Sequence, residues 1–212
     1  MKKSMLKNGL LLALFALLCT ALVAVVNDLT KDQIRAQEQK QLLLVLEQII
    51  PNQLHDNMLT ENCTLLNDPD ALGTNEDMPA FIATRNGKPV AVAIETIAPD
   101  GYSGAIKLIV GISAEGKVLG VRTLNHQETP GLGDKIELKK SRWVEEFNGK
   151  SINNANEKSW GVKKDGGDFD QFTGATITPR AYVKAVRKAL LYFNANKQQI
   201  FSQPLTCGVT HE

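Results

Sequence analysis

Histidine and cysteine are scarce in this chain, which contains three of each among 212 residues. No two cysteines are spaced as Cys-x-x-Cys, and no two histidines are spaced as His-x-x-x-His. Structural zinc sites usually draw four ligands of these types from short spacings. The sequence therefore predicts no metal site.

The chain also lacks an excess of positive or negative charge. Lys and Arg number 24 and Asp and Glu number 23, which leaves a formal net charge of +1, and the basic residues are spread along the chain. A basic stripe would indicate a nucleic-acid partner and an acidic tract would indicate a solvating tail, but the sequence has neither. No Gly-rich run ends in Gly-Lys-Ser/Thr, as a phosphate-binding loop would. The composition, 43% hydrophobic and 22% charged, is that of a globular domain.

One long hydrophobic run lies near the N-terminus. Three lysines precede an uncharged segment over residues 9–26, of which the apolar part, Leu10 to Val26, has 17 residues. As a helix this part would measure about 25 Å, at the short end of what a bilayer core of roughly 30 Å requires. Because the lysines precede the run, residues 1–8 are expected in the cytoplasm and residues 27–212 in the periplasm. The sequence predicts a single-pass bacterial inner-membrane protein with its anchor at 9–26.

A cleaved signal peptide is the competing interpretation of this run. Signal peptides have apolar cores of about 7–15 residues followed by a small-x-small cleavage site. The run here is longer, and Leu22 interrupts the site that would end at Ala24. The pattern favours an uncleaved anchor, although Ala24 leaves a weaker site before Asn27.

A juxtamembrane helix is expected over residues 27–51. Asp28 or Thr30 is suited to cap it, and Pro51 is expected to end it. Its apolar residues recur at helical spacing and indicate a face that docks on the following domain: Leu42, Val45, Leu46, Ile49 and Ile50.

Residues 52–212 are predicted to form an α+β domain, an antiparallel sheet with flanking helices. Residues 52–78 are polar and turn-rich, and no regular element is expected there. Two hairpins follow, one over 81–97 with an Asn-Gly turn and one over 106–124. A short helix is expected over 136–147, with Trp143 and Phe147 on one apolar face. A long loop of the kind that is often functional is expected over 148–170. The last helix is predicted to run to about residue 198, with Thr178 as N-cap and Pro179 as its first residue. Its apolar residues recur at helical spacing and predict a buried face: Val183, Val186, Leu190 and Phe193.

The motif Thr173-Gly174-Ala175-Thr176-Ile177-Thr178 precedes this last helix. Helix N-termini carry free N–H groups and the positive end of the helix dipole, so they hold phosphate well. Gly174 and Ala175 let a ligand approach the backbone closely, and a threonine hydroxyl placed there is able to accept a phosphoryl group. The alternative is that Thr173, Thr176 and Thr178 only cap the helix.

Two further stretches complete a recognisable set. The first is Gly101-Tyr102-Ser103-Gly104, and the second is His126-Gln127-Glu128-Thr129-Pro130-Gly131-Leu132-Gly133. With the threonine motif, in this order and behind an N-terminal span, they resemble the FMN-binding domain family. The resemblance covers nearly all of the chain and is greatest to G subunits of Rnf complexes, called Rsx in enteric bacteria. C subunits of the sodium-pumping NADH:quinone oxidoreductase are the nearest relatives of that group.

The resemblance implies a cofactor and a site. In the family, FMN is attached through its phosphate to the residue that falls on Thr176 here. The other residues expected to bind the cofactor are Thr173, Gly174, Ala175, Thr178, Tyr102, Ser103, Glu128, Thr129, Leu132 and Lys163. Thr129-Pro130-Gly131 is expected to form a tight turn, while Lys163 and Lys164 have a solvated charge pair as their alternative. His126 and Glu128 could be a metal pair, but two ligands do not make a site.

The resemblance also implies a function. The chain would relay electrons in an Rnf/Rsx-type complex with other membrane subunits, iron–sulfur proteins and a second flavinylated subunit. It would be a redox subunit of a translocase rather than a stand-alone enzyme. Since the sequence has no nucleotide-binding loop with which to modify itself, an FMN transferase of the ApbE type is expected to attach the cofactor. The alternatives are a C-type subunit of the sodium-pumping enzyme, a domain that binds flavin without a covalent bond, and a scaffold subunit without flavin.

Two cysteines remain outside the predicted span. Cys63 precedes the sheet and Cys207 follows the last helix, and both are expected in an oxidising compartment. An even pair there favours a disulfide, which would tie the C-terminal tail to the start of the domain. Two free thiols are the alternative, since the bond requires the Cα atoms to come within about 7 Å.

Overall fold

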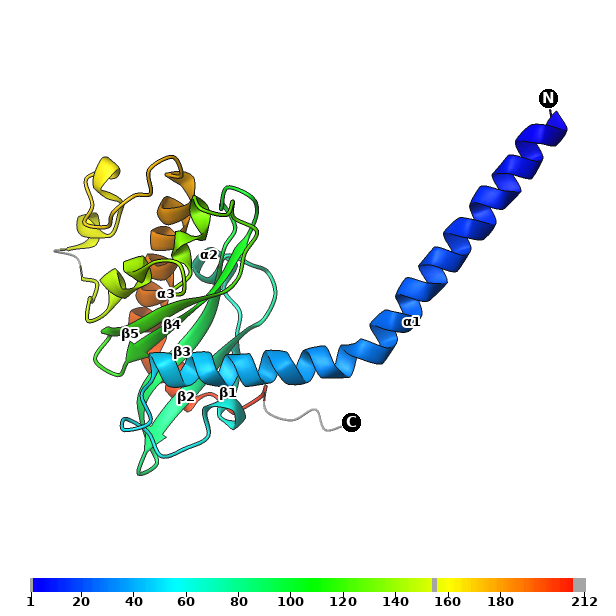
Figure 1. Cartoon of the computed structure of the whole chain (residues 1–212). Helices are drawn as coiled ribbons and strands as arrows, with labels where there is room; N and C mark the ends of the chain where they lie inside the picture. Colours follow the sequence, from blue (N-terminus) through cyan, green and yellow to red (C-terminus); the bar gives the residue numbers. More distant parts are fainter. Residues whose placement is uncertain (1, 154–155, 208–212) are drawn as a thin grey trace. The chain divides into compact units, whose positions relative to one another are not determined.

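The computed structural model describes residues 2–153 and 156–207. The chain divides into two compact units, Met1–Leu42 and Leu43–Glu212, and Figure 1 follows it from blue at the N-terminus to red. The parts of the predictions that fall on residues 1, 154–155 and 208–212, including the end of the C-terminal tail, lie outside the described residues.

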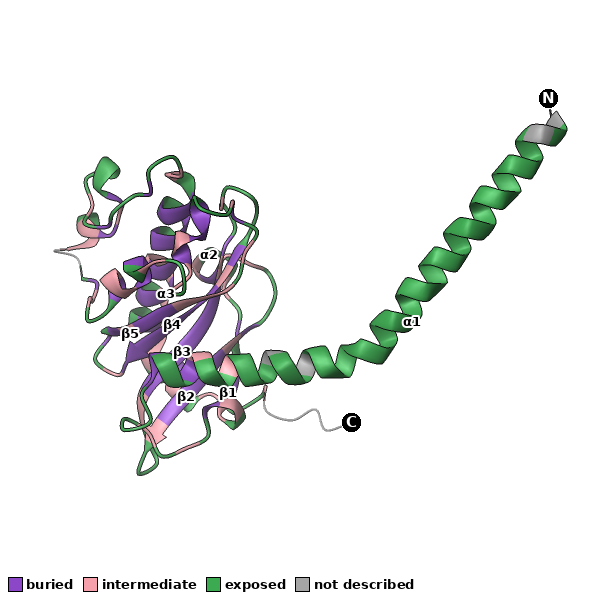
Figure 2. Cartoon of the chain, in the orientation of Figure 1, coloured by how far each residue is buried: buried purple, intermediate pink, exposed green. Residues whose placement is uncertain are grey.

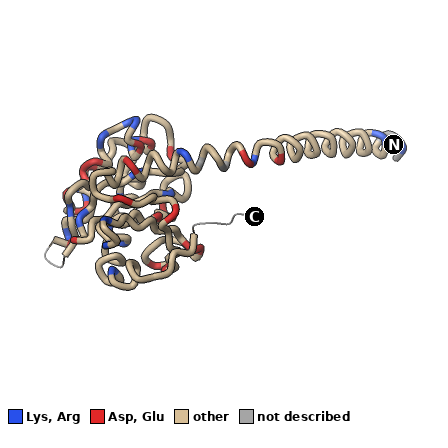
Figure 3. The backbone as a smooth tube through the Cα atoms, turned by 90° about the horizontal axis from the view of Figure 1, so that it is seen from below, with Lys and Arg blue, Asp and Glu red and all other residues tan. Residues whose placement is uncertain are grey.

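The first helix, α1 (Lys2–Ile49), is continuous where the sequence predicts two helices. The expected start at Asp28 or Thr30 is wrong, because the helix already runs through both residues. The Thr30 hydroxyl donates to the Val26 carbonyl one turn back, at 2.8 Å, and does not cap a new helix. No Gly or Pro lies between residues 10 and 50 to interrupt the helix. Its most apolar 18-residue window has a mean hydropathy of 2.8 and is fully exposed, so by length and composition this helix could cross a membrane. Figure 3 shows the stretch without charges.

Five antiparallel strands form one sheet in the order β1-β2-β3-β4-β5. The predicted hairpins are confirmed as β2 (Met78–Arg85) with β3 (Lys88–Ala98), and β4 (Ile106–Ser113) with β5 (Val118–Asn125). Between β2 and β3, Asn86 and Gly87 both have positive φ, 52° and 71°, as a type I′ turn requires.

The prediction that residues 52–78 lack regular structure is wrong. They contain a 3-10 turn η1 (Leu59–Glu61), strand β1 (Cys63–Leu66) and a one-turn helix α2 (Pro69–Leu72). β1 pairs with β2 and is an edge of the sheet. Four residues are too few to show a period, so only the pairing with β2 identifies this strand.

The C-terminal segment lies along the free side of β1. The Thr206 N–H donates to the Cys63 carbonyl at 2.8 Å, and the Thr206 hydroxyl accepts from the Leu65 N–H at 3.2 Å. A disulfide joins Cys63 to Cys207, whose Cα atoms are 5.3 Å apart, within the range that a bond requires. Cys19 is free. That the bond forms in the protein made by cells remains a prediction.

The single helix expected over 136–147 is replaced by two 3-10 turns, η2 (Gly133–Ile136) and η3 (Arg142–Phe147). The Ser141 hydroxyl accepts from the Trp143 N–H and so begins a new turn instead of continuing the first. Trp143 and Phe147 are both buried, as the sequence indicates, and their rings meet edge to face at 5.4 Å. The loop that follows carries η4 (Glu157–Ser159) and η5 (Lys163–Asp165).

The last helix, α3 (Ile177–Ser202), packs on one face of the sheet and completes the core, which is purple in Figure 2. Its predicted buried face is confirmed: Val183, Val186, Leu190 and Phe193 are all inaccessible or nearly so. Alternate residues of β3, such as Val92 and Ile94, point into the same core. The domain is therefore α+β, a helix layer on an antiparallel sheet.

The C-terminal turns of α1 belong to the same compact unit and pack on the sheet. Leu46, Ile49 and Ile50 are completely buried, which confirms the predicted docking face. Room for Ile49 is made by a pair of glycines, Gly111 on β4 and Gly120 on β5, which face each other across the two strands. A Cβ on Gly111 would lie 1.9 Å from Ile49 Cγ2, whereas a Cβ on Gly120 would lie 3.5 Å from Ile49 Cα.

Gly111→Ala is expected to destabilise the domain because the added methyl group must displace Ile49. Overpacking of this kind costs about 1–3 kcal/mol of unfolding free energy. Gly120→Ala is the matched control: its methyl group would make an ordinary contact, and the expected change is below about 1 kcal/mol. Denaturant unfolding of the full-length protein in detergent would measure both.

A double variant tests the mechanism. Ile49→Ala removes the atoms that Gly111→Ala would meet, so the two changes should be non-additive, with a total cost smaller than the sum. A stable Gly111→Ala variant, or strict additivity, would contradict the packing described.

Candidate functional site

A cavity of about 260 Å³ lies where three segments of the domain meet. These are the loop between β3 and β4, the loop after β5, and the start of α3. Eight of its ten lining residues are among those that the resemblance singles out, and sequence reasoning missed the other two, Gly133 and Ile177. The eight are Tyr102, Glu128, Thr129, Leu132, Gly174, Ala175, Thr176 and Thr178.

Thr176 is the N-cap residue of α3, and its side chain makes no capping hydrogen bond. It follows a tight turn closed by the Ala175 N–H, which donates to the Phe172 carbonyl at 3.1 Å. Gly174 supplies the positive φ of 80° that this turn needs. Within the described part of the chain, the Thr176 hydroxyl has no hydrogen-bond partner, and Thr176 lines a cavity at the positive end of a 26-residue helix. An anionic group bound there would meet the unpaired N–H groups of the first turn.

Thr178 has a different role from the predicted one. The helix begins at Ile177, so the expectation that Thr178 caps it and Pro179 is its first residue is wrong. The Thr178 side chain is fully buried, and its hydroxyl donates to Glu128 Oε2. A contact between distant segments thus overrides the local capping preference.

Glu128 is a buried carboxylate, only 4% exposed, at the wall of the cavity. Its Oε1 accepts from the Ser103 N–H at 3.0 Å, and its Oε2 accepts from Thr178. Gly101 and Gly133 leave room for it, because a Cβ on either would come within 2.9 Å of a carboxylate oxygen. The carboxylate therefore joins all three segments of the site.

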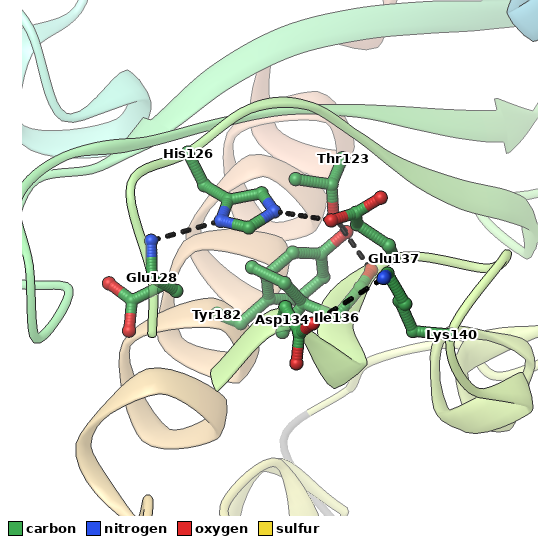
Figure 4. A network of polar contacts seen from close by, with 8 residues as sticks. All are labelled: Thr123, His126, Glu128, Asp134, Ile136, Glu137, Lys140 and Tyr182. Carbon is green, nitrogen blue, oxygen red and sulfur yellow. Dashed lines mark hydrogen bonds and ion pairs between the residues drawn. The ribbon is translucent and has the colours of Figure 1, made fainter. Parts of the chain in front are cut away.

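His126 holds the backbone of Glu128, as Figure 4 shows. Its Nδ1 accepts from the Glu128 N–H at 3.0 Å, so in the neutral ring the proton is on Nε2, which lies 2.9 Å from Glu137 Oε1. The imidazole thus links the loop after β5 to the segment after η2. In the described residues, no group of three or more His, Cys, Asp or Glu side chains is arranged to hold a metal ion.

Figure 4 shows a second set of contacts beside this ring. The Thr123 hydroxyl donates to the Ile136 carbonyl at 2.8 Å and is hydrogen-bonded to the Tyr182 hydroxyl at 3.1 Å. Burial raises the pKa of the Tyr182 phenol. At neutral pH the Tyr182 phenol is therefore uncharged, and its hydrogen bond to Thr123 links α3 to β5.

The turn expected at Thr129-Pro130-Gly131 is confirmed. The N–H groups of Leu132 and Gly133 both donate to the Thr129 carbonyl at 3.1 Å, and Gly131 has a φ of 79°. The turn carries Leu132 to the rim of the cavity, where Leu132, Ile177 and Tyr102 are 41%, 45% and 67% exposed. Large apolar side chains left open around one cavity are suited to cover a flat, largely apolar ligand.

Three of the expected residues do not line the cavity. Thr173 is exposed in the turn before Thr176, and Ser103 contributes its backbone N–H to Glu128. Lys163 forms an exposed ion pair with Asp170 at 2.5 Å, and that hydrogen bond raises the pKa of the lysine. Lys163 therefore lies outside the cavity lining, and a contact between Lys163 and the cofactor stays a prediction.

The donor set and shape of the site fit FMN. The start of α3 supplies N–H groups and a free hydroxyl for a phosphate, and the apolar rim supplies a surface for the flavin ring. Gly174 lines the same cavity and has no side chain to occupy it.

Comparison with known proteins agrees with this geometry. Residues 1–49 match the family described as RnfG N-terminal region, and residues 101–191 match the FMN-binding domain family. Over 212 residues the chain is 68% identical to the G subunit of the ion-translocating oxidoreductase complex of Shewanella baltica and 65% identical to that of Shewanella oneidensis, with complete coverage of both chains in each case. The corresponding G subunit of Vibrio vulnificus is 60% identical over 206 residues, or 97% of each chain.

Proposed function

Because the chain belongs to the family of G subunits of ion-translocating oxidoreductase complexes, we propose that it carries FMN covalently on Thr176 and relays electrons within such a complex. The observation that carries the covalent part is the free hydroxyl of Thr176, a residue that lines the cavity at the N-terminus of α3. A threonine that only capped the helix would use this hydroxyl on the backbone of the first turn. The phosphate would be held by that hydroxyl and by the N–H groups of Ile177 and Thr178.

FMN, when bound, supplies one-electron and two-electron transfer. The residues of the chain supply the position and the surroundings of the ring. Leu132, Ile177 and Tyr102 would cover the ring and exclude water on the side that they face. The remaining ring edge would stay accessible to a neighbouring subunit, as a relay requires. A covalent bond also retains the cofactor outside the cytoplasm.

A denaturing gel tests the attachment directly. The polypeptide made in cells that contain the transferase should keep yellow flavin fluorescence after denaturation, and its intact mass should exceed the polypeptide by one FMN residue. Flavin lost on denaturation would support binding without a covalent bond. A chain that never carries flavin would support the scaffold alternative.

An FMN transferase of the ApbE type is the proposed partner for attachment. With FAD as donor, the Oγ–H bond of Thr176 and the pyrophosphate P–O bond of FAD break, an Oγ–P bond forms, and AMP leaves while the proton passes to solvent. After purified apo-protein is mixed with FAD and Mg²⁺ alone, the denatured polypeptide is expected to carry no flavin, because the chain has no nucleotide-binding loop. Addition of the transferase should then give the fluorescent product. Spontaneous attachment without it would overturn this proposal.

The proposed location is the bacterial inner membrane, with residues 1–8 in the cytoplasm, 9–26 as the anchor, 27–51 as the juxtamembrane helix and 52–212 in the periplasm. The apolar, exposed part of α1 and the lysines before it support this orientation. A reporter that works only in the periplasm, fused after Glu212, is expected to be active, and a cytoplasmic reporter at the same place should be silent. The opposite pattern would reverse the topology and remove the flavin from the periplasm. Purification of the intact complex with its other subunits would test the partners.

A further inference from the structure

The start of α3 lies earlier than its own residues favour. A threonine followed by proline is a common pair at N-cap and first helical position. Thr178 and Pro179 form such a pair, yet the helix begins at Ile177 with Thr176 at the N-cap. A contact from outside the helix must therefore engage Thr178.

That contact is made by Glu128. Its Oε2 accepts from the Thr178 hydroxyl, and both side chains are buried. A hydrogen bond to a carboxylate is stronger than one between neutral groups, so this bond outweighs a cap formed with a backbone N–H. With Thr178 engaged in this way, Thr176 takes the N-cap position.

The carboxylate itself is held in place. Its second oxygen, Oε1, is bonded to the Ser103 N–H at 3.0 Å. A Cβ on Gly133 would lie 2.8 Å from Oε2, and one on Gly101 would lie 2.9 Å from Oε1, so the space around it is filled. The Glu128 N–H donates to His126 Nδ1 at 3.0 Å, which fixes the backbone of the carboxylate. Because these contacts fix the Glu128 carboxylate, it is suited to fix the position of the Thr178 hydroxyl that is bonded to it.

We propose that Glu128 is a positioning residue for flavin attachment. By engaging Thr178 it fixes the start of α3 at Ile177, and this leaves the Thr176 hydroxyl unbonded and open to the cavity. The inference rests on the proposed function, since it concerns the same hydroxyl. It gives the side chains of Glu128 and Thr178 a role in presenting Thr176, while the Thr178 backbone N–H stays available to the phosphate.

Kinetics of attachment test this role. Full-length protein in detergent is incubated with an ApbE-type transferase, FAD and Mg²⁺, and the fluorescence of the denatured polypeptide is followed at several protein concentrations. Glu128→Gln and Thr178→Val are each expected to lower kcat about tenfold or more while KM changes less than about twofold, because a displaced hydroxyl slows the chemical step more than docking. Thr178→Ser keeps the hydroxyl and should restore kcat. The Glu128→Gln/Thr178→Val double variant should be no slower than the slower single variant, because both remove one contact.

Two controls separate this role from a general loss of structure. Glu76→Gln changes an exposed carboxylate outside the cavity and should leave kcat at the parent value. Amide hydrogen exchange should become faster in Glu128→Gln at residues 176–180 and stay unchanged in the sheet. Exchange that rises throughout the domain, or a Thr178→Ser variant as slow as Thr178→Val, would mean that Glu128 only stabilises the fold and would overturn the inference.

The two proposals fail in different ways. If the parent protein is not modified on Thr176, the proposed function is wrong. If the parent is modified and both Glu128→Gln and Thr178→Val match its kcat, attachment on Thr176 stands and the positioning role of Glu128 is wrong.

Discussion

Thr176→Ala is expected to abolish covalent flavin completely. The alanine has no oxygen with which to form the phosphoester, and the neighbouring hydroxyl of Thr178 is buried against Glu128 and so is not available to replace it. Intact mass should return to that of the polypeptide, and fluorescence should disappear from the denatured band. Folding should be nearly unchanged, because the Thr176 side chain makes no capping bond that alanine would remove.

Thr173→Ala is the matched control for this experiment. Thr173 belongs to the same motif but is exposed and does not line the cavity. We expect attachment to continue in this variant, at a reduced rate at most. Flavin that remains bonded in Thr176→Ala would show that another residue carries it, and peptide mapping would identify that residue.

Loss of the disulfide is expected to give the largest change in stability. Cys63 and Cys207 are 144 residues apart, and closing a loop of that length stabilises by about 5 kcal/mol in the chain-entropy model, with about 2–5 kcal/mol typical on removal. Cys207→Ser removes the bond and leaves the buried Cys63 side chain in place. Tm should fall by about 5–15 °C at the few degrees per kcal/mol usual for domains of this size. Thermal unfolding of full-length protein in detergent, in a Cys19→Ser background, would measure it.

Reduction supplies the control for the disulfide. A reductant should lower Tm of the parent to that of Cys207→Ser and should leave the variant itself unchanged. Non-reducing peptide mapping of periplasmic protein should recover Cys63 and Cys207 in one linked pair. Two freely alkylated cysteines, or a Tm that does not respond to reductant, would contradict the prediction. The proposal for Thr176 would stand in either case, since its chemistry requires no thiol.

The elements that the sequence predicts correctly are those whose signal is local. Alternating apolar residues and the Asn86-Gly87 turn define the hairpin of β2 and β3, and the stripe from Val183 to Phe193 defines the buried face of α3. Strand β1 is missed because it has four residues and is formed only by pairing with β2. The region of η2 and η3 resembles one helix in sequence because its apolar spacing conceals the break at Ser141.

In the site, too, local signals predict the residues correctly and contacts between distant segments do not show in the sequence. Three motifs separated in the sequence meet at one cavity, which the resemblance indicates and periodicity alone does not. The predicted start of α3 is too late because local capping favours Thr178, while the bond that decides the outcome comes from Glu128, 50 residues away. Lys163 is a candidate only because it is close to the motif in sequence, and its ion pair with Asp170 depends on how the loop folds.

Both edges of the sheet are paired within the chain at some positions, which limits where a strand from another chain is able to add. Along β1, Thr206 takes the outward Cys63 carbonyl and Leu65 N–H, and at the start of β5 the Val118 carbonyl and N–H are bonded to Gly149 and Lys150. Backbone groups left open at a sheet edge invite a strand from another chain, and here they are already paired at these positions. At these positions a strand from another chain would find no free backbone groups, so the pairing disfavours strand addition, and with it growth into fibrils, along β1 and at the start of β5.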